Sequence, residues 1–245
     1  MALKHVAVIG AGVSGLTATK ECLAQGIDVT CYEMHDDIGG TWYYTEHLRP
    51  DEGATIYDFL ITNTSREMMR YSDFNFPPHA AVFPRHKEVH DYLIAYANHF
   101  DVTKHVKLNT KVIDIQKSEN HLQNGKWKVV TQQKDETKKE ITEFDGVIVC
   151  NGFHKIPSIP DIDGFSNFQG QWSHSKTFKS GKHFARKRVL VIATGPLFPT
   201  AELQARYAAM VFAGKKKLPS KDVMTTDIKR WQDIHEAFFG KGKYW

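Results

Sequence analysis

The stretch HVAVIGAGVSGL, residues 5–16, decides the fold of this chain. Its apolar start, residues 5–9, predicts a short buried β-strand. Three glycines follow in the G-x-G-x-x-G spacing: Gly10, Gly12 and Gly15. In such a turn the first glycine permits a tight bend, the second lets the backbone approach a pyrophosphate, and the third lets a helix pack against the strand. The stretch therefore predicts a strand, a phosphate-binding turn and a helix, with Val13 and Ser14 at the helix N-terminus facing the phosphates.

A dinucleotide is the ligand that this arrangement predicts. The next apolar run, residues 27–32, ends in Glu33, 18 residues beyond Gly15, where an acidic side chain hydrogen-bonds the ribose diol of such a cofactor. A carboxylate there repels the 2'-phosphate of NADP, and the neighbouring Met34 and His35 supply no arginine to bind it. NADP is therefore disfavoured at this first site, and FAD or NAD remain.

The loop after Glu33 contains two glycines and a tryptophan, in the sequence IGGTW of residues 38–42. Gly40, Thr41 and Trp42 suit close backbone approach to an extended cofactor with an aromatic neighbour, so they are candidate cofactor-binding residues. A tight turn capped by a core tryptophan is the alternative interpretation.

Composition excludes several other classes of protein. The 245 residues carry a net charge of +4 without a dense basic stripe, which argues against nucleic-acid binding. No apolar run approaches the roughly 18 residues of a membrane span, so no transmembrane segment is expected. The three cysteines lack C-x-x-C spacing and lie in apolar contexts, which indicates free thiols in a reducing compartment and a cytoplasmic location.

The middle of the chain predicts one helix and three strands. Residues 88–100 have the apolar spacing of an amphipathic helix, and residues 106–115, 126–132 and 140–149 read as strands of a meander that returns to the sheet. His86 and His90 stand four residues apart, but H-K-E-V-H is not the H-E-x-x-H zinc pattern, so no metal site is expected.

Three segments, VAVIGAGVSGL, CYEMHDDIGGTW and TIYDFLITNTSREMMRYSDFNFP, together resemble the flavin-containing monooxygenases. The segment FQGQWSHSKTF is similar to that family's F-x-G-x-x-x-H signature, through Phe168, Gly170 and His174. The resemblance runs from residue 3 to residue 192 and resumes in LFPTAELQARYAAMVFAGKKKLPS, which looks like a segment nearer the family's C-terminus. It implies an α/β fold, with a Rossmann-like FAD-binding domain made of a parallel sheet and a β-meander.

The resemblance also implies a chemistry. Enzymes of this family use FAD, NADPH and molecular oxygen to oxygenate a small-molecule amine or sulfide through a C4a-hydroperoxyflavin, as in N,N-dimethylaniline monooxygenases. Asn63 matches the family asparagine beside the flavin and nicotinamide, which makes it the catalytic candidate, and Thr62 and Thr64 flank it as cofactor-binding candidates. An ordinary loop asparagine is the alternative.

The stretch KRVLVIATGPLFP, residues 187–199, departs from the family pattern. Its apolar run predicts the buried strand that opens the NADPH domain in the family, but residues 193–198 lack the second glycine-rich turn, and Pro196 and Pro199 remove backbone donors that should face phosphate. An internal deletion of most of the NADPH domain is the simplest interpretation. It leaves the second dinucleotide domain missing or vestigial and makes any NADPH site in this chain doubtful.

Two domains are therefore expected. Residues 1–192 form the FAD-binding domain with the start of the lost NADPH domain, and residues 193–245 form a C-terminal helical segment docked on it, with a helix at 200–213. Trp231, Phe238 and Phe239 lack their usual partners and predict a self-association surface. The family is often at the endoplasmic reticulum membrane, but its hydrophobic tail is not expected here.

Three functions remain open at this point. The first is an FAD-dependent monooxygenase of soft nitrogen or sulfur nucleophiles. The second is a truncated, catalytically inactive FAD-binding remnant, because nothing obvious holds NADPH. The third is an NAD-dependent reductase that uses the first turn alone, although the chain shows no recognisable acid or base pair for hydride transfer.

Overall fold

The computed structural model describes residues 5–49, 52–152, 155–157, 159, 162–192, 220, 222–223 and 226. The chain divides into two compact units, Met1–Val189 and Leu190–Trp245. All the helices and strands given below lie in the first unit.

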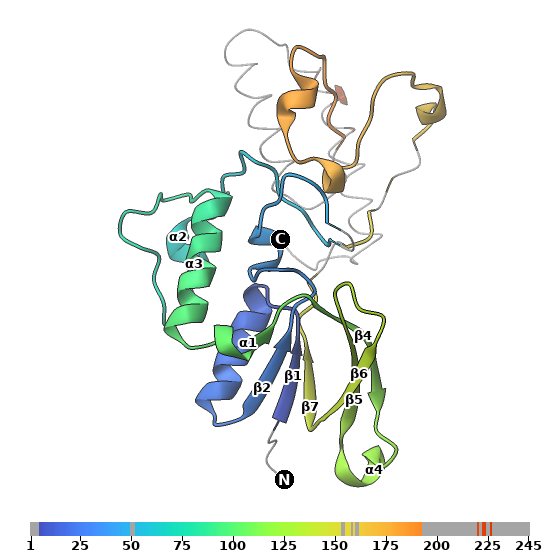
Figure 1. Ribbon diagram of the computed structural model, residues 1–245. Coiled ribbons are helices and arrows are strands. Elements are labelled where there is room, and N and C mark those ends of the chain that lie inside the picture. The colour runs from blue at the N-terminus through green and yellow to red at the C-terminus, as the bar shows by residue number, and fades with distance from the viewer. Residues whose placement is uncertain are drawn as a thin grey trace. The chain divides into compact units, whose positions relative to one another are not determined.

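A parallel four-stranded sheet forms the centre of the first unit (Figure 1). Its strands, in the order β3-β2-β1-β7, are β3 (Val106–Lys107), β2 (Asp28–Tyr32), β1 (His5–Ile9) and β7 (Gly146–Val149). The first predicted strand has the bounds expected from the sequence. β1 is paired on both edges, with Val8 opposite Cys31 on one side and Ile148 on the other. A continuous apolar run suits this strand because both of its faces are covered.

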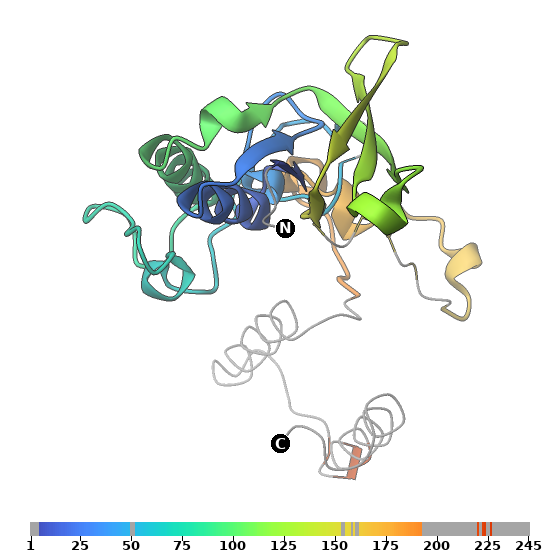
Figure 2. The same ribbon diagram turned by 90° about the horizontal axis from the view of Figure 1, so that it is seen from below.

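Two helices pack beside each other on one face of this sheet (Figure 2). They are α1 (Val13–Ala24) and α3 (His86–His99). In α3 the buried side chains of Val89, Leu93 and Tyr96 recur at the helical period, which places one face of the helix in the core. The predicted amphipathic helix is therefore present, and it begins two residues earlier than expected.

Short helical turns lie between these elements and after β7. They are η1 (Gly40–Trp42), α2 (Arg66–Met69), η2 (Thr103–His105), α4 (His121–Asn124), η3 (Phe165–Asn167), η4 (Ser175–Thr177) and η5 (Gly181–Phe184). No helix in the part of the chain that the structure describes has both the length and the apolar character to cross a bilayer.

An antiparallel meander covers the other face of the sheet. It consists of β4 (Thr110–Lys117), β5 (Trp127–Gln133) and β6 (Lys139–Phe144), in the order β4-β5-β6. Val129 and Phe144 pack there against Ala7 and Tyr32 of the parallel sheet. The α/β fold with a parallel sheet and a meander is as the sequence predicts.

Two of the predicted meander strands are in fact two strands each. The predicted strand 106–115 divides into β3 and β4 because Asn109 takes a left-handed conformation, with φ of 52°, and turns the chain out of the parallel sheet. The predicted strand 140–149 divides at Asp145, whose N–H donates to the carbonyl of His5 at 2.9 Å. In both places an apolar pattern continues although the chain changes sheets, so hydrophobicity alone does not show the break.

The prediction of a buried strand within residues 187–192 is wrong. Residues 189–192 have no regular structure, and Leu190 is 84% exposed. Among the described residues no strand pairs with this run, and an apolar strand of a parallel sheet needs partners to bury its faces.

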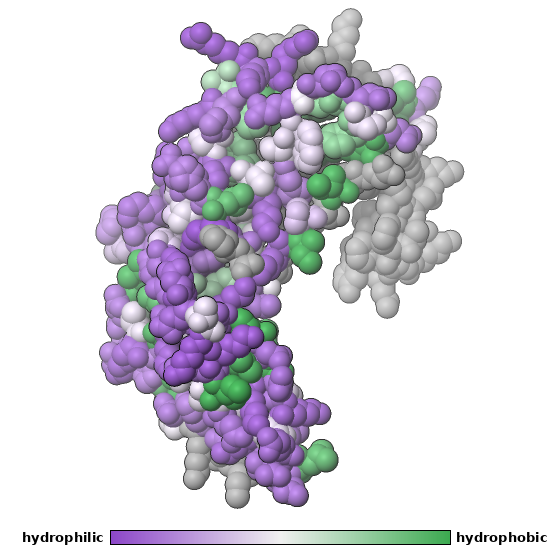
Figure 3. Space-filling model, turned by 45° about the vertical axis from the view of Figure 1, so that its right-hand side comes forward, coloured by the Kyte–Doolittle hydropathy of each residue, from purple (hydrophilic) through white to green (hydrophobic). Residues whose placement is uncertain are grey.

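On the face drawn in Figure 3, exposed apolar side chains are interrupted by hydrophilic ones.

Several predictions fall outside the described residues. These are the broken turn at 193–198, the helix at 200–213, and the exposed aromatic side chains of Trp231, Phe238 and Phe239.

Candidate functional site

The turn between β1 and α1 requires glycine at two positions. Gly10 has a φ of +98°, and its N–H donates to the carbonyl of Tyr32 at 2.7 Å. A Cβ on Gly10 would lie 2.6 Å from the carbonyl oxygen of Cys150, and a Cβ on Gly15 would lie 1.7 Å from that of Gly10. The tight bend and the close helix packing that the motif requires are therefore both present.

The N-terminus of α1 is open to an anion. Gly12 is the N-cap residue and has no side chain to accept from the first backbone N–H groups, and the first turn carries no acidic residue. Val13 and Ser14 of this turn are exposed. Because the helix dipole and the uncapped N–H groups both favour negative charge, a pyrophosphate fits here.

Glu33 fastens this turn to the end of β2. Its side chain is 5% exposed, with Oε2 accepting from the N–H of Ala11 at 2.8 Å and Oε1 accepting from the N–H of His35 at 2.9 Å. An ionised carboxylate has about four acceptor positions, so two remain for ribose hydroxyls. Burial, and then the nearby Arg49 guanidinium, lower the pKa of His35, which favours a neutral imidazole beside this carboxylate.

The loop with Gly39 and Gly40 closes over the phosphate turn. The N–H of Gly39 donates to the carbonyl of Ala11 at 2.9 Å, and a Cβ on Gly40 would lie 3.1 Å from the Cα of Gly12. Thr41 is exposed, and the half-buried Trp42 packs against the core. The loop is thus a tight turn capped by a tryptophan, and it also brings its glycines against the phosphate turn.

Thr62, Asn63 and Thr64 lie on a second, well-fixed loop. The N–H of Thr62 donates to the carbonyl of Pro84 at 3.0 Å, and its Oγ1 donates to the carbonyl of Thr64 at 2.9 Å. Thr62 is buried, whereas Asn63 is exposed and its Oδ1 accepts from Oγ1 of Thr64 at 3.4 Å. Among the described residues, no hydrogen bond joins this loop directly to Gly12.

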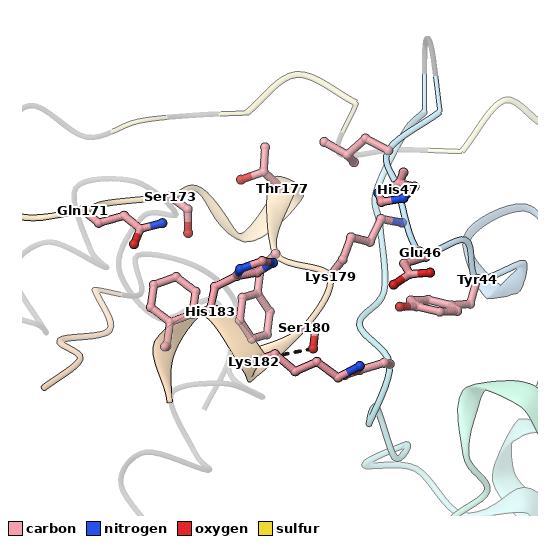
Figure 4. Close-up of a pocket in the computed structure, with 14 residues that line it drawn as sticks. Tyr44, Glu46, His47, Gln171, Ser173, Thr177, Lys179, Ser180, Lys182 and His183 are labelled. Atoms are coloured by element: carbon pink, nitrogen blue, oxygen red, sulfur yellow. Dashed lines mark hydrogen bonds between the residues drawn. The ribbon is translucent and has the colours of Figure 1, made fainter. Parts of the chain in front are cut away.

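A cavity of about 680 Å³ lies between residues 44–48 and residues 171–184 (Figure 4). Part of the F-x-G-x-x-x-H signature segment lines it, through Ser173 and Thr177. The signature histidine itself, His174, accepts from the N–H of Lys176 through Nδ1 at 3.0 Å and caps η4. None of the predicted cofactor-binding residues lines this cavity.

Lys179, which lines the cavity, belongs to a buried ion pair. Nζ of Lys179 lies 3.1 Å from Oε1 of Glu52, and the two side chains are 9% and 5% exposed. The N–H of Asp58 donates to the carbonyl of Lys179 at 2.9 Å, and Nη2 of Arg49 lies 3.5 Å from the same Glu52 oxygen. Sequence reasoning missed this pair because its members are 127 residues apart and belong to no motif.

Comparison with known proteins places this chain. The flavin-binding monooxygenase-like family model matches residues 3–197 and 192–244, so its two matches meet where the sequence departs from the family pattern. Flavin-containing monooxygenase 1 of Homo sapiens is 43% identical over 195 residues, which are 78% of this chain and 36% of that protein. The chain thus spans little more than a third of that relative's length.

Solved structures agree with this match. S-allyl-L-cysteine S-oxygenase from Allium sativum superposes with a TM-score of 0.66 and 32% identity, over 75% of this chain and 45% of that one. The OTEMO complex with FAD and NADP superposes with a TM-score of 0.51 and 28% identity, over 74% and 31% of the two chains. The expected family and Rossmann-like fold are confirmed: this chain belongs to the flavin-binding monooxygenase-like family.

Proposed function

We propose that this chain binds FAD and acts as a monooxygenase of soft nitrogen or sulfur nucleophiles, with NADPH as the reductant and molecular oxygen as the second substrate. The observation that carries the proposal is the closed cradle at the end of β1. There the uncapped helix N-terminus, the buried Glu33 and the Gly39–Gly40 loop converge on one turn. FAD supplies the two-electron chemistry and the activation of oxygen when it is bound.

Different residues of the cradle would bind different parts of the cofactor. Gly12, Val13, Ser14 and the neighbouring glycines would hold the pyrophosphate, because backbone N–H groups face it there. The two free acceptor positions of Glu33 suit the ribose hydroxyls. Gly40, Thr41 and Trp42 would lie along the extended cofactor beyond the pyrophosphate.

Asn63 would act beside the reacting part of the flavin. Since its Oδ1 accepts from Thr64, its two Nδ2 hydrogens remain as donors on an exposed side chain. Such a donor can orient an oxygen atom or a cofactor carbonyl without moving a proton. Thr64 contacts the amide through its hydroxyl, and Thr62 fixes the backbone of the loop by donating to the carbonyl of Thr64.

The names of relatives support the substrate class. S-allyl-L-cysteine S-oxygenase and the N-oxide-forming dimethylaniline monooxygenase 2 of Pan troglodytes are named for S- and N-oxygenation respectively. A small amine or sulfide is therefore the substrate we propose. The three free cysteines support a reducing, cytoplasmic location.

A second candidate is an FAD-binding chain without turnover. The exposed, irregular run at 189–192 favours it, because this run would begin an NADPH domain and has no strand partner among the described residues. In that case residues 1–192 are the cofactor domain and residues 193–245 a helical extension of it.

One titration separates these functions. The purified chain is loaded with FAD and titrated with NADPH without oxygen, while the oxidised flavin absorbance is followed. Bleaching, followed by S-oxide or N-oxide formation from a thioether or tertiary amine in air, supports the monooxygenase. Bound flavin that stays oxidised supports the second candidate. A colourless protein that oxidises NADH would support an NAD-dependent reductase instead.

A further inference from the structure

Two histidines of α3 lie outside the lining of the cavity and are not among the predicted cofactor-binding residues. His86 and His90 lie one helical turn apart and therefore on the same side of the helix. Among the described residues no group of three or more side chains could hold a metal ion. Both rings instead contact loops, and the two loops are those that carry Gly40 and Asn63.

His90 contacts the loop that closes over the phosphate turn. Its Nε2 lies 3.0 Å from the carbonyl oxygen of Ile38, and since a carbonyl only accepts, Nε2 carries the proton. The ring stacks on Tyr43, with centroids 5.3 Å apart and planes at 19°. A Cβ on Gly39 would lie 2.6 Å from the ring, so this glycine admits the imidazole. Nε2 is also 3.7 Å from a carboxylate oxygen of Asp37.

His86 makes the corresponding contacts one turn earlier. Its Nε2 lies 3.1 Å from the carbonyl oxygen of Asp58, and its ring lies 5.0 Å from that of Tyr44. The backbone N–H of His86 donates to the carbonyl of Leu60 at 3.2 Å. The segment that leads into Thr62 is thus attached to the first turn of α3.

We propose that His86 and His90 are positioning residues that set the spacing between the two cofactor-facing loops, residues 38–43 and residues 58–63. The helix that carries them is itself fixed, because Val89, Leu93 and Tyr96 are buried in the core. Each histidine donates to a carbonyl of one loop, so the rigid helix holds the two loops at a fixed distance from each other. This inference rests on the proposed FAD site, which the two loops would form together.

The expected effect follows from the hydrogen bonds. Each bond contributes a modest amount to loop order, and a cofactor that spans both loops binds more weakly when one of them must be ordered on binding. Loss of either donor should therefore weaken FAD binding about fivefold to tenfold. It should leave the fold intact, because both histidines are only partly buried.

The test uses His90→Leu and His86→Leu, with His90→Gln and His86→Gln as conservative variants that keep a donor near Nε2. His99→Gln is the matched control, since His99 is an exposed histidine near the end of the same helix. Two quantities are measured on the full chain: the FAD dissociation constant, and amide hydrogen exchange of residues 36–44 and 57–62 without FAD.

We expect His90→Leu to speed exchange in residues 36–43 and not in residues 57–62, and His86→Leu to speed it in residues 57–62 and, through its ring contact with Tyr44, at residue 44 but not in residues 36–43. We also expect both to weaken FAD binding, and the glutamine variants to restore most of each effect. Exchange in both loops unchanged by the leucine variants, or FAD binding unchanged by them, would overturn the inference. If the unaltered chain does not bind FAD, the proposed function and the cofactor role fail together, while the exchange data still decide whether the histidines hold the loops.

Discussion

Two apolar runs of this chain, at 5–9 and at 189–192, have the same sequence character and different structures. Both are rich in β-branched and aliphatic residues, and a glycine follows each within three residues. The first is a strand with parallel partners on both edges, and Val8 is completely buried. The second has no regular structure, and Val191 is 58% exposed.

The difference shows what a strand of a parallel sheet depends on. Such a strand needs neighbours for its hydrogen bonds and layers on both faces for its side chains. The run at 5–9 receives both from β2, β7, α1 and the meander. The local pattern at 189–192 predicts a strand, but the partners that would make it one are not among the described residues.

The largest expected effect, on stability and on FAD binding together, is at the turn that follows the first run. Gly15→Val adds a Cβ that would lie 1.7 Å from the carbonyl oxygen of Gly10, which is backbone and cannot move aside. We expect a loss of about 3 kcal/mol or more in the free energy of unfolding and no measurable FAD binding. Urea unfolding and flavin fluorescence check both.

Gly53→Ala is the control for this variant, because a Cβ there meets no atom within 4 Å. If Gly15→Val folded with normal stability, the close approach of α1 to β1 would not require glycine at position 15.

The next largest effect is expected at the ion pair of Glu52 with Lys179, which lies ten residues before the second run. Glu52→Gln leaves the buried Lys179 and the partly buried Arg49 without their carboxylate. Breaking a buried pair in this way costs about 3–5 kcal/mol, so the midpoint of urea unfolding should fall clearly. Glu143→Gln removes an exposed pair with Lys126 at 4.0 Å and should change the free energy of unfolding by less than about 0.5 kcal/mol. Equal effects would contradict the assignment of the Glu52 pair as buried.

A smaller effect is expected at the carboxylate that fastens the first turn. Glu33→Ala leaves the N–H groups of Ala11 and His35 without their acceptor, which should cost about 2 kcal/mol of the free energy of unfolding. FAD should also bind at least tenfold more weakly, because the ribose loses its acceptor. Glu21→Ala, at an exposed position of α1, should change neither quantity. An unchanged FAD dissociation constant for Glu33→Ala would remove this residue from the cofactor site.

The smallest effect sharpens the comparison directly. Val191→Ser should change the free energy of unfolding by less than about 0.5 kcal/mol, because the side chain is largely exposed. Val8→Ser, at the fully buried position of the first run, should cost about 3 kcal/mol. Thermal or urea unfolding of both variants measures these changes. A large loss in the free energy of unfolding for Val191→Ser would mean that the second run is buried in solution.

Much of the candidate cofactor cradle could be predicted from sequence because its parts are local. The glycine spacing, the strand before it and Glu33 at the next strand end all follow from short-range patterns. The hydrogen bond from Ala11 to Glu33 then forms because adjacent parallel strands end at the same edge of the sheet.

The parts that sequence reasoning missed depend on long-range packing. The pair of Lys179 with Glu52 and the contact of His90 with Ile38 join residues far apart in the chain, and neither has a spacing that predicts it. The divided strands at Asn109 and Asp145 were missed for a different reason. Their apolar pattern continues through the break, and only the backbone conformation or a backbone hydrogen bond marks it.

The position of β1 between β2 and β7 has a consequence for how the protein folds as it is made. β2 leaves the ribosome soon after β1, whereas β7 emerges only with residue 149, more than a hundred residues later. Until then one edge of the central strand is unpaired, and contacts of such long sequence separation form slowly. Chains released or stalled before residue 149 would expose that edge, so incomplete products of this sequence should depend on chaperones more than the finished chain does.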